Sequence, residues 1–393
     1  MDYNTDTRTP LSINFEVAKM ATKQPIKVFW DQGTAYDFLT SLYVLHFPDE
    51  FGLRGAWAAG VRSRLPNEAR EFLEKIVGNF NPPLNWVYSL TAPKNAASVL
   101  VSLSQIPAED RLAVLRLCPF ESKRGSELLN EILQHGQWEP EMVTEFLHLW
   151  RTQNSDTLVV PGPASTKRVE KIFEIYADPL RFGRNYLDSL QAYYDAFFSE
   201  EEKRISAKLE KALVHARQMV EKKGAATFLQ SISEHLSVDS LQDGGQVVMA
   251  PSYWCSRGVL HSDLEQDQHL ILFAARPEEE SLVPGEIVPE ELLLRLKAMT
   301  DPTRMRILRY LLQEQLTPAE LARRLRLRAP TVTHHLHLLK SAGMVHFVKK
   351  GKNEHLYFAK MESIKNTYTL LKDFLEQDVS IVEGFDLFDN DLL

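Results

Sequence analysis

Residues 316–358 read LTPAELARRLRLRAPTVTHHLHLLKSAGMVHFVKKGKNEHLYF, and this stretch decides how the C-terminal part of the chain folds. Its opening residues, 317–320 (TPAE), have the spacing of a capping box with proline at the first helical position, so a helix is predicted to begin there. Leu321 and Leu325 give that helix an apolar stripe at i and i+4. The basic turn 326–328 is too polar to continue the core, so the helix is predicted to end before it.

A second helix is predicted over 329–342, with Pro330 in its first turn. Val332, Leu336 and Leu339 fall at i, i+4 and i+7 and are expected to face inward. The polar side chains left on the outward side are Thr331, Thr333, His334, His337 and Lys340. Two helices joined by a short turn, with a polar free face on the second, are typical of a helix-turn-helix.

Gly343 is predicted to end the second helix in the left-handed conformation. The residues after it form an expected two-stranded basic ribbon, the wing, with Lys349, Lys350 and Lys352 around its turn. The stretch therefore predicts a winged helix-turn-helix.

Composition limits the kind of protein further. At 393 residues with 44% apolar content, the chain is long enough for two or more domains with real cores. It has no apolar run long enough to span a membrane, and its first residues lack the features of a secretory signal. The two cysteines, Cys118 and Cys255, are far apart, which favours a reducing, cytoplasmic location over disulfides or structural zinc.

The charge is distributed unevenly along the chain. The net charge is −8, but residues 290–378 hold 16 Lys and Arg against 10 Asp and Glu, a balance of +6. The remainder of the chain therefore carries −14. A basic module attached to an acidic body is expected when one part of a protein meets phosphates and the rest does not.

The fold class predicted is mainly α with a small antiparallel β component: a helical body followed by the winged helix-turn-helix. The expected divisions are a flexible tail (1–22), a mostly helical body that could divide near 158–166 (23–275), an exposed acidic linker (276–289), the winged helix-turn-helix (290–378) and an acidic tail (379–393). Three strands, at 246–250, 257–260 and 269–275, are predicted to form an antiparallel sheet in the body. Separate long helices are predicted over 179–198 and 199–222, the second beginning with a capping box at Ser199 and Glu202.

Four motifs in order, MTDPTRMRIL (299–308), LTPAELARRL (316–325), PTVTHHLHLLKSAGMV (330–345) and KKGKNEHLYF (349–358), resemble the ArsR-type winged-helix transcriptional regulators. The preceding residues resemble more loosely, around PSYWC (251–255), the N-terminal region of long, poorly characterised regulators of that type. The resemblance implies a sequence-specific, cytoplasmic DNA-binding regulator, expected to be a repressor, that binds double-stranded DNA as a homodimer.

By position, the resemblance makes 329–342 the recognition helix. The side chains expected at base edges are Thr331, Thr333, His334 and His337. Those expected at phosphates are Lys340, Lys349, Lys350 and Lys352, with Arg326 and Arg328 (and Arg323 and Arg324 beside them) as further backbone contacts.

A metal site is not expected. His334, His335 and His337 lie close together, but no Cys or acidic residue near them in sequence completes a ligand set, and His335 is expected to pack at the edge of the core. The family's metal sensors carry ligands on the helix matching 317–325 or on the last helix, 361–377; the first has no Cys or His here and the second no His. No cofactor is predicted. The N-terminal body is expected to bind an unidentified small-molecule or protein effector, to supply dimer contacts, or both.

Two other classes remain open for the body. It has no P-loop, GxGxxG, GxSxG or HExxH motif, so no catalytic residue is predicted and the chain is not expected to be an enzyme. The alternatives are an enzyme or a protein-interaction scaffold tethered to a DNA-binding module. A buried structural role is expected for Cys255.

Overall fold

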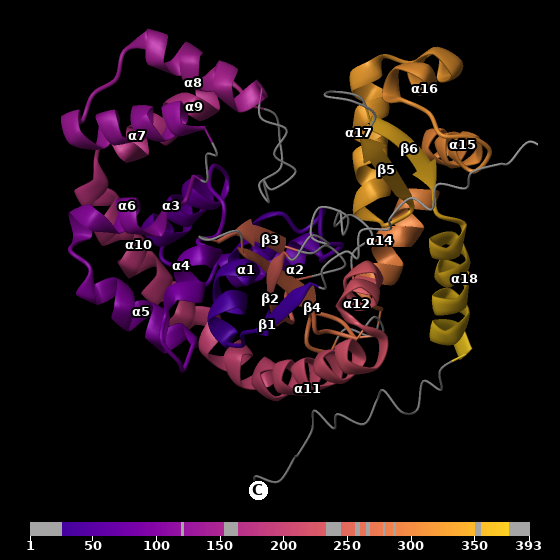
Figure 1. Ribbon diagram of the computed structural model, residues 1–393, viewed down its shortest axis with the longest axis horizontal. Helices are drawn as coiled ribbons and strands as arrows, with labels where there is room; N and C mark the ends of the chain where they lie inside the picture. Colours follow the sequence, from indigo (N-terminus) through magenta and orange to yellow (C-terminus); the bar gives the residue numbers. More distant parts are fainter. Residues whose placement is uncertain are drawn as a thin grey trace, which may run out of the picture.

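The computed structural model describes residues 26–118, 122–152, 164–232, 245–255, 260–264, 268–277, 280–285, 288–349 and 355–376. These residues form a mostly helical N-terminal body and a C-terminal winged helix-turn-helix that lies to one side of it (Figure 1). The two parts have separate hydrophobic cores, one built from residues between 35 and 283 and the other from residues between 298 and 345. The mainly α fold class is confirmed.

The helices of the first part of the body form an arc beside a central sheet, apart from the first helix, which packs against the sheet (Figure 1). They are α1 (Thr34–His46), α2 (Gly55–Arg62), α3 (Asn67–Val77), α4 (Leu84–Ser89), α5 (Ala96–Gln105), the short 3₁₀ turn η1 (Ala108–Asp110), α6 (Arg111–Leu115), α7 (Lys123–His135), α8 (Pro140–Thr152), α9 (Thr166–Tyr176) and α10 (Pro179–Tyr193). The core is continuous across the position where a division near 158–166 was expected, since Phe146 of α8 and Phe173 of α9 pack with ring centroids 5.2 Å apart. The body therefore does not divide into two cores there.

The long helices that follow are joined without a break. After α10 the chain continues through one π-helical turn, η2 (Tyr194–Phe198), directly into α11 (Ser199–Lys223), and α12 (Ala225–Ile232) follows. The predicted capping box at Ser199 is therefore wrong, because Ser199 lies inside a continuous helix and makes no cap. The Glu202 carboxylate instead accepts hydrogen bonds from the Thr34 hydroxyl and, at 2.9 Å, from the backbone N–H of Ala96.

The central sheet has four strands in the order β1-β2-β4-β3. They are β1 (Lys27–Trp30), β2 (Gln246–Ser252), β3 (Leu260–Asp263) and β4 (Gln268–Ala274). Strands β1, β2 and β4 are parallel, and only β3 pairs antiparallel with β4. The predicted antiparallel arrangement is therefore confirmed for the β3–β4 pair and wrong for β2, and β1 was missed.

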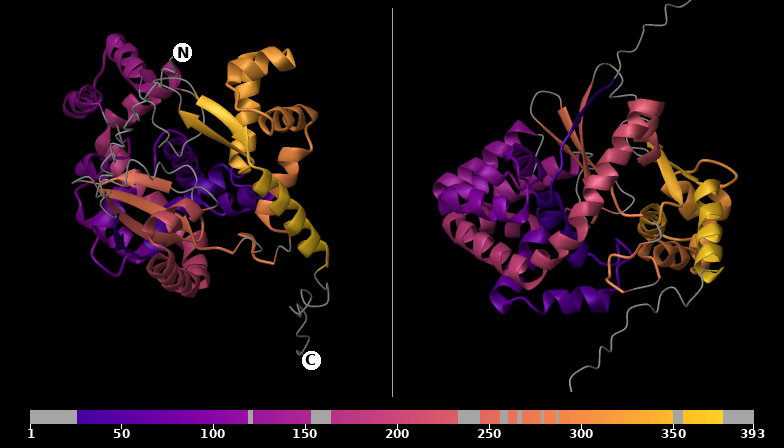
Figure 2. Two further views of the ribbon diagram at one scale, coloured as in Figure 1. Left: turned by 45° about the vertical axis from the view of Figure 1, so that its right-hand side comes forward. Right: turned by 90° about the horizontal axis from the view of Figure 1, so that it is seen from below.

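Helices cover both faces of this sheet. Val248 and Leu270 belong to the main core beneath α1, whereas Val247 and Met249 pack in a second cluster with residues of α11 and α12. The view from below shows α11 and α12 lying along that second face (Figure 2). Strands buried on both faces carry continuous apolar runs, such as VVMA in β2, and such runs are typical of parallel sheets.

The described part of 276–289 is not an exposed connector, and this expectation is corrected. Ser281, Leu282 and Val283 are buried, because Leu282 and Val283 pack into the body core while Ser281 bonds to Glu290. The prediction failed because it considered the acidic composition of the whole stretch, whereas the apolar pair Leu282 and Val283 within it is buried.

The winged module begins immediately afterwards. Its elements are α14 (Glu290–Met299), α15 (Pro302–Leu311), α16 (Pro318–Leu325), α17 (Ala329–Ser341), β5 (Val345–Lys349), β6 (His355–Ala359) and α18 (Met361–Glu376). Asp301 caps α15, accepting from the N–H of Arg304 at 2.8 Å, with Pro302 at the first helical position. Both expected tails, 1–22 and 379–393, lie outside the described residues. Within the described part of the chain, none of the helices has the length and apolarity needed to cross a membrane.

Candidate nucleic-acid interface

The first helix of the helix-turn-helix is held at its N-terminus by the predicted capping box. The N–H of Glu320 donates to the Thr317 hydroxyl at 3.2 Å, and the N–H of Thr317 donates to the Glu320 carboxylate at 2.8 Å. Pro318 occupies the first helical position. Two backbone donors of the helix terminus are thereby satisfied, which fixes where α16 starts.

The turn between α16 and α17 depends on one strained residue. Arg326 adopts the left-handed conformation, with φ +57°, a region that side chains other than glycine enter at a cost. Because the backbone turns at this left-handed residue, the N–H of Leu327 donates to the carbonyl of Ala322 at 3.0 Å, and this hydrogen bond ends the helix. Arg326 and Arg328 are both exposed as a result, so the turn presents two guanidinium groups to solvent beside the start of α17.

Helix α17 has the two faces that its sequence predicted. Val332, Leu336 and Leu339 are fully buried in the core of the winged module. The side chains exposed on the other face are Thr331, Thr333, His334 and His337. The Thr333 hydroxyl donates to the carbonyl of Ala329 at 3.0 Å, and its oxygen can still accept a hydrogen bond.

Lys340 and the wing extend this face. The Lys340 ammonium lies 4.6 Å from the ring centroid of Phe347 in β5, so its aliphatic stem is half buried against the wing. Strands β5 and β6 form the predicted antiparallel ribbon, and Gly343 before it has the predicted positive φ, +67°. The side chain of Lys349 and the whole of Lys350 and Lys352 lie outside the described residues, so their placement stays a prediction.

The neighbouring basic residues differ in how freely they face solvent. Arg324 forms an ion pair with Glu314 and lies over the ring of Tyr310, so its charge is partly compensated within the module. Arg323 is exposed on the same helix. Of the arginines preceding the recognition helix, the structure thus leaves Arg323, Arg326 and Arg328 the more open to solvent.

His335 packs at the edge of the core, as expected. Its Nδ1 lies 3.9 Å from the Asp301 carboxylate, and burial lowers the pKa of the imidazole although that carboxylate acts in the opposite direction. Across the described residues, no group of three or more His, Cys, Asp or Glu is placed to hold a metal ion. Cys255 is buried beside β4, with its thiol 3.8 Å from the carbonyl of Leu272.

One residue at this interface comes from the body. The Glu50 carboxylate, in the loop between α1 and α2, lies 3.7 Å from Nδ1 of His337 and accepts a hydrogen bond from the Ser341 hydroxyl at 3.4 Å. No local pattern in the sequence indicates this contact, because it joins residues 291 positions apart.

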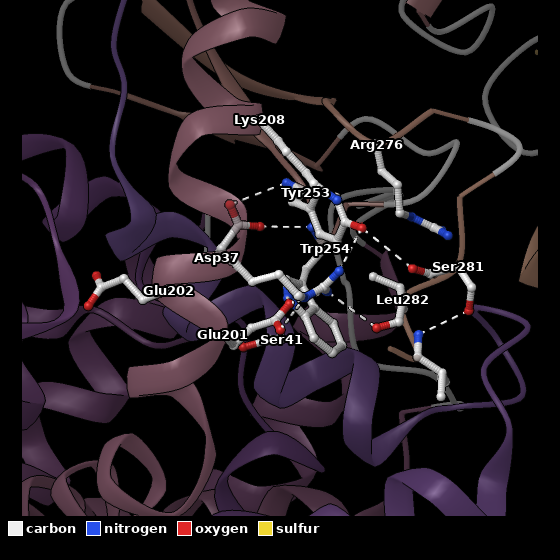
Figure 3. Close-up of polar contacts among 12 residues, drawn as sticks. Asp37, Ser41, Glu201, Glu202, Lys208, Tyr253, Trp254, Arg276, Ser281 and Leu282 are labelled. Atoms are coloured by element: carbon white, nitrogen blue, oxygen red, sulfur yellow. Dashed lines mark hydrogen bonds and ion pairs between the residues drawn. The ribbon is translucent and has the colours of Figure 1, made fainter. Parts of the chain in front are cut away.

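A buried polar network connects the centre of the body to its C-terminal segment (Figure 3). Asp37 of α1 accepts hydrogen bonds from the Ser252 hydroxyl at 2.6 Å and from the backbone N–H groups of Tyr253 and Trp254 at 3.2 and 2.8 Å. Complete burial raises the pKa of this carboxyl to about 7, against the effect of these hydrogen bonds. The indole N–H of Trp254 donates in turn to Glu201 of α11 at 2.8 Å.

The network continues to the first residue of the winged module. Arg204 binds Glu201 and donates at 3.0 Å to the Tyr253 hydroxyl, which itself donates to Glu280 at 2.8 Å. Glu290, the first residue of α14, then accepts from the Ser281 hydroxyl and the backbone N–H of Leu282. These contacts hold the start of α14 against the body.

An apolar stripe lies open on the last helix. Met361, Tyr368 and Leu375 of α18 are seven residues apart and are 48%, 64% and 70% exposed. Ile364 of the same helix packs against the core of the winged module. The apolar side chains of α18 are therefore only partly buried within the chain.

Comparison with known proteins agrees with this geometry. A family model described as a helix-turn-helix domain matches residues 299–346. The transcriptional repressor SdpR of Bacillus subtilis (strain 168) is 36% identical over 56 residues, which are 14% of this chain and 62% of SdpR. The match thus spans less than two thirds of that repressor.

A crystal structure of an ArsR family transcriptional regulator is 25% identical and matches 24% of this chain and 93% of its own, with a TM-score of 0.20. At that TM-score the likeness carries no weight. The assignment of a winged helix-turn-helix rests on the capped α16, the two-faced α17, the wing and the two sequence matches, all within one module. This chain carries a C-terminal winged helix-turn-helix domain.

Proposed function

We propose that the protein is a sequence-specific DNA-binding transcriptional regulator of the ArsR type, that it acts as a repressor in the cytoplasm, and that it does so as a homodimer. The observation that carries the proposal is the outer face of α17, where polar side chains stand exposed above a closed apolar core. A helix of this kind fits the major groove, because its diameter with side chains, about 10–12 Å, is close to the groove width of about 12 Å.

The side chains divide by chemistry into two sets. Thr331, Thr333, His334 and His337 are the proposed base-edge contacts, because short polar groups on the groove-facing helix can read donors, acceptors and thymine methyl groups. The proposed phosphate contacts are the cations around them: Arg326, Arg328, Lys340, Lys349, Lys350 and Lys352. A repressor that is similar over this module, SdpR, supports the assignment.

The dimer is proposed to form through α18. Exposed apolar side chains at a seven-residue spacing suit a helix that packs against a symmetry-related copy of itself. Two copies joined in this way would present two α17 helices to half-sites about 34 Å apart. Burial of Tyr368 and Leu375 in both copies would remove from water the two most exposed large apolar side chains among the described residues of the winged module.

The body is proposed to sense the effector, a small molecule or a protein. What supports this is the chain of buried and part-buried polar contacts from Asp37 through Tyr253 to Glu290, which joins the body centre to the first residue of the winged module. An effector that favours one arrangement of this chain of contacts needs a coupling free energy of only about 1–3 kcal/mol to change DNA occupancy 5- to 150-fold.

A binding titration tests the proposal. A labelled random duplex of about 30 base pairs, long enough for two half-sites, is titrated with the wild type and with a Lys349→Gln/Lys350→Gln/Lys352→Gln variant. The matched control removes three exposed lysines from α11 of the body, Lys211, Lys222 and Lys223, by the same substitution. The proposal predicts that only the wing variant binds more weakly, and equal loss in both variants would contradict it.

A further inference from the structure

The loop between α1 and α2, residues 47–54, touches the winged module at two places. Its Glu50 carboxylate contacts His337 and Ser341 of α17, at 3.7 and 3.4 Å. Its Gly52 packs against the start of α14: a Cβ at this position would lie 2.7 Å from the carbonyl oxygen of Glu290 and 3.0 Å from Cβ of Leu294. The loop therefore lies against both the recognition helix and the helix that anchors the module.

The loop is held in this position by its own structure. The N–H of Glu50 donates to the carbonyl of Phe47 at 3.0 Å, and the N–H of Leu53 donates to that of Pro48 at 2.8 Å. Leu53 is buried in the body core, and Gly52 has φ +70°, where a side chain would be strained. Glu50 is thus presented to α17 by a folded turn that is fixed at its far end to the body.

This position conflicts with DNA binding by α17. His337 belongs to the proposed base-reading face, and a helix with its side chains fills the width of the major groove, so no space remains for a second protein segment beside it. The Glu50 carboxylate also brings a negative charge to a face that is proposed to meet phosphates, and it would repel them. Duplex and loop cannot occupy this side of α17 together.

We propose that the α1–α2 loop is an internal competitor of DNA, with Glu50 occupying part of the recognition-helix surface until the winged module moves away from the body. The inference rests on the proposed DNA-binding function and adds how the body controls it. The arrangement described here is the closed state. The apparent DNA association constant is then the intrinsic association constant multiplied by the fraction of molecules that are open.

The test compares two substitutions in the same loop. Glu50→Gln removes the carboxylate that faces α17, whereas Asp49→Asn removes the same charge from the exposed preceding residue. Binding of the full chain to a labelled random duplex of about 30 base pairs is measured at low salt by fluorescence anisotropy. We expect Glu50→Gln to bind roughly two- to fivefold more tightly than the wild type, the effect of losing one partly exposed charge contact. Asp49→Asn is expected to change the affinity by less than half as much.

The outcomes separate this inference from the proposed function. If the wild type binds and the two variants have equal affinities, the loop does not compete with DNA and the inference is overturned while the function stands. If neither the wild type nor Glu50→Gln binds the duplex at low salt, both are overturned. A Glu50→Ala variant that also binds more tightly than Asp49→Asn would show that the lost carboxylate, rather than a new amide contact, is responsible.

Discussion

The Glu290 carboxylate lies 2.7 Å from a terminal nitrogen of the Arg276 guanidinium, and both side chains are buried, 3% and 7% exposed. Glu290 begins α14 of the winged module, and Arg276 follows β4 of the body. The same guanidinium nitrogen donates to the carbonyl of Glu280, which keeps the segment between them folded against the pair. This buried ion pair links the two parts directly.

Breaking this pair is expected to be costly. Glu290→Ala leaves the buried Arg276 charge without its carboxylate, and such losses cost roughly 3–5 kcal/mol. Urea unfolding followed by tryptophan fluorescence measures this cost, because the six tryptophans all lie in the body sequence. Glu362→Ala, at an exposed position of α18, is the control and should change the free energy of unfolding by under about 0.5 kcal/mol. A cost for Glu290→Ala as small as that of the control would contradict the role of the pair.

Asp37 should make stability depend on pH. Its pKa is raised from 3.8 to about 7 by burial, so the folded state binds more protons than the unfolded state between these values. The stabilisation is present in full below pH 3.8 and is lost as the pH rises through 7. Relative to Asp37→Asn, the wild type should lose up to about 1.4 kcal/mol per pH unit within this window. Parallel stability curves for the two proteins between pH 4 and pH 7 would be evidence against the raised pKa.

Substitution of Arg326 should change DNA affinity without lowering the stability of the protein. Arg326→Gly relieves a left-handed residue, so the free energy of unfolding should stay equal or rise by about 1 kcal/mol. DNA affinity should fall, because the proposed phosphate contact is lost. Arg116→Gly is a matched control, since Arg116 in the body is also left-handed, with φ +46°. It should leave DNA affinity unchanged. Equal affinity of Arg326→Gly and the wild type would remove Arg326 from the interface.

The α18 stripe should control the oligomeric state. Tyr368→Glu places a charge in the middle of the proposed dimer contact. It is expected to weaken self-association at least tenfold, because losing the burial of this apolar side chain costs about 1.4 kcal/mol or more of association free energy. Analytical ultracentrifugation over a range of concentrations measures this. Asn366→Glu adds the same charge at an exposed position off the stripe and should leave association intact. A wild type that sediments as a monomer at all concentrations would rule out the dimer.

The sequence predicts best what is determined locally. The capping box at 317–320 and the left-handed Gly343 depend on neighbours three or four residues away, and both were found as predicted. The exposed face of α17 likewise follows from helical periodicity. The local structure of the winged module could therefore be predicted from its own residues.

What the sequence did not reveal depends on distant partners. Strand β1 is four residues long and pairs in parallel with β2, more than two hundred residues later. Asp37 binds Ser252 across 215 positions, and Glu50 meets Ser341 across 291. Arg326 is a different case: a non-glycine residue in the left-handed region carries no local signal, because the surrounding helices impose the conformation.

The salt dependence of duplex binding tests the central claim most directly. DNA affinity of the wild type is measured between about 50 and 200 mM salt, and the slope of log K against log salt is determined. If cations of the α17 face and wing meet phosphates, affinity should fall steeply, with a slope of roughly −0.9 for each phosphate contacted, and the Lys349→Gln/Lys350→Gln/Lys352→Gln variant should give a shallower slope. A wild type whose affinity is independent of salt, or a variant with an unchanged slope, would contradict the account.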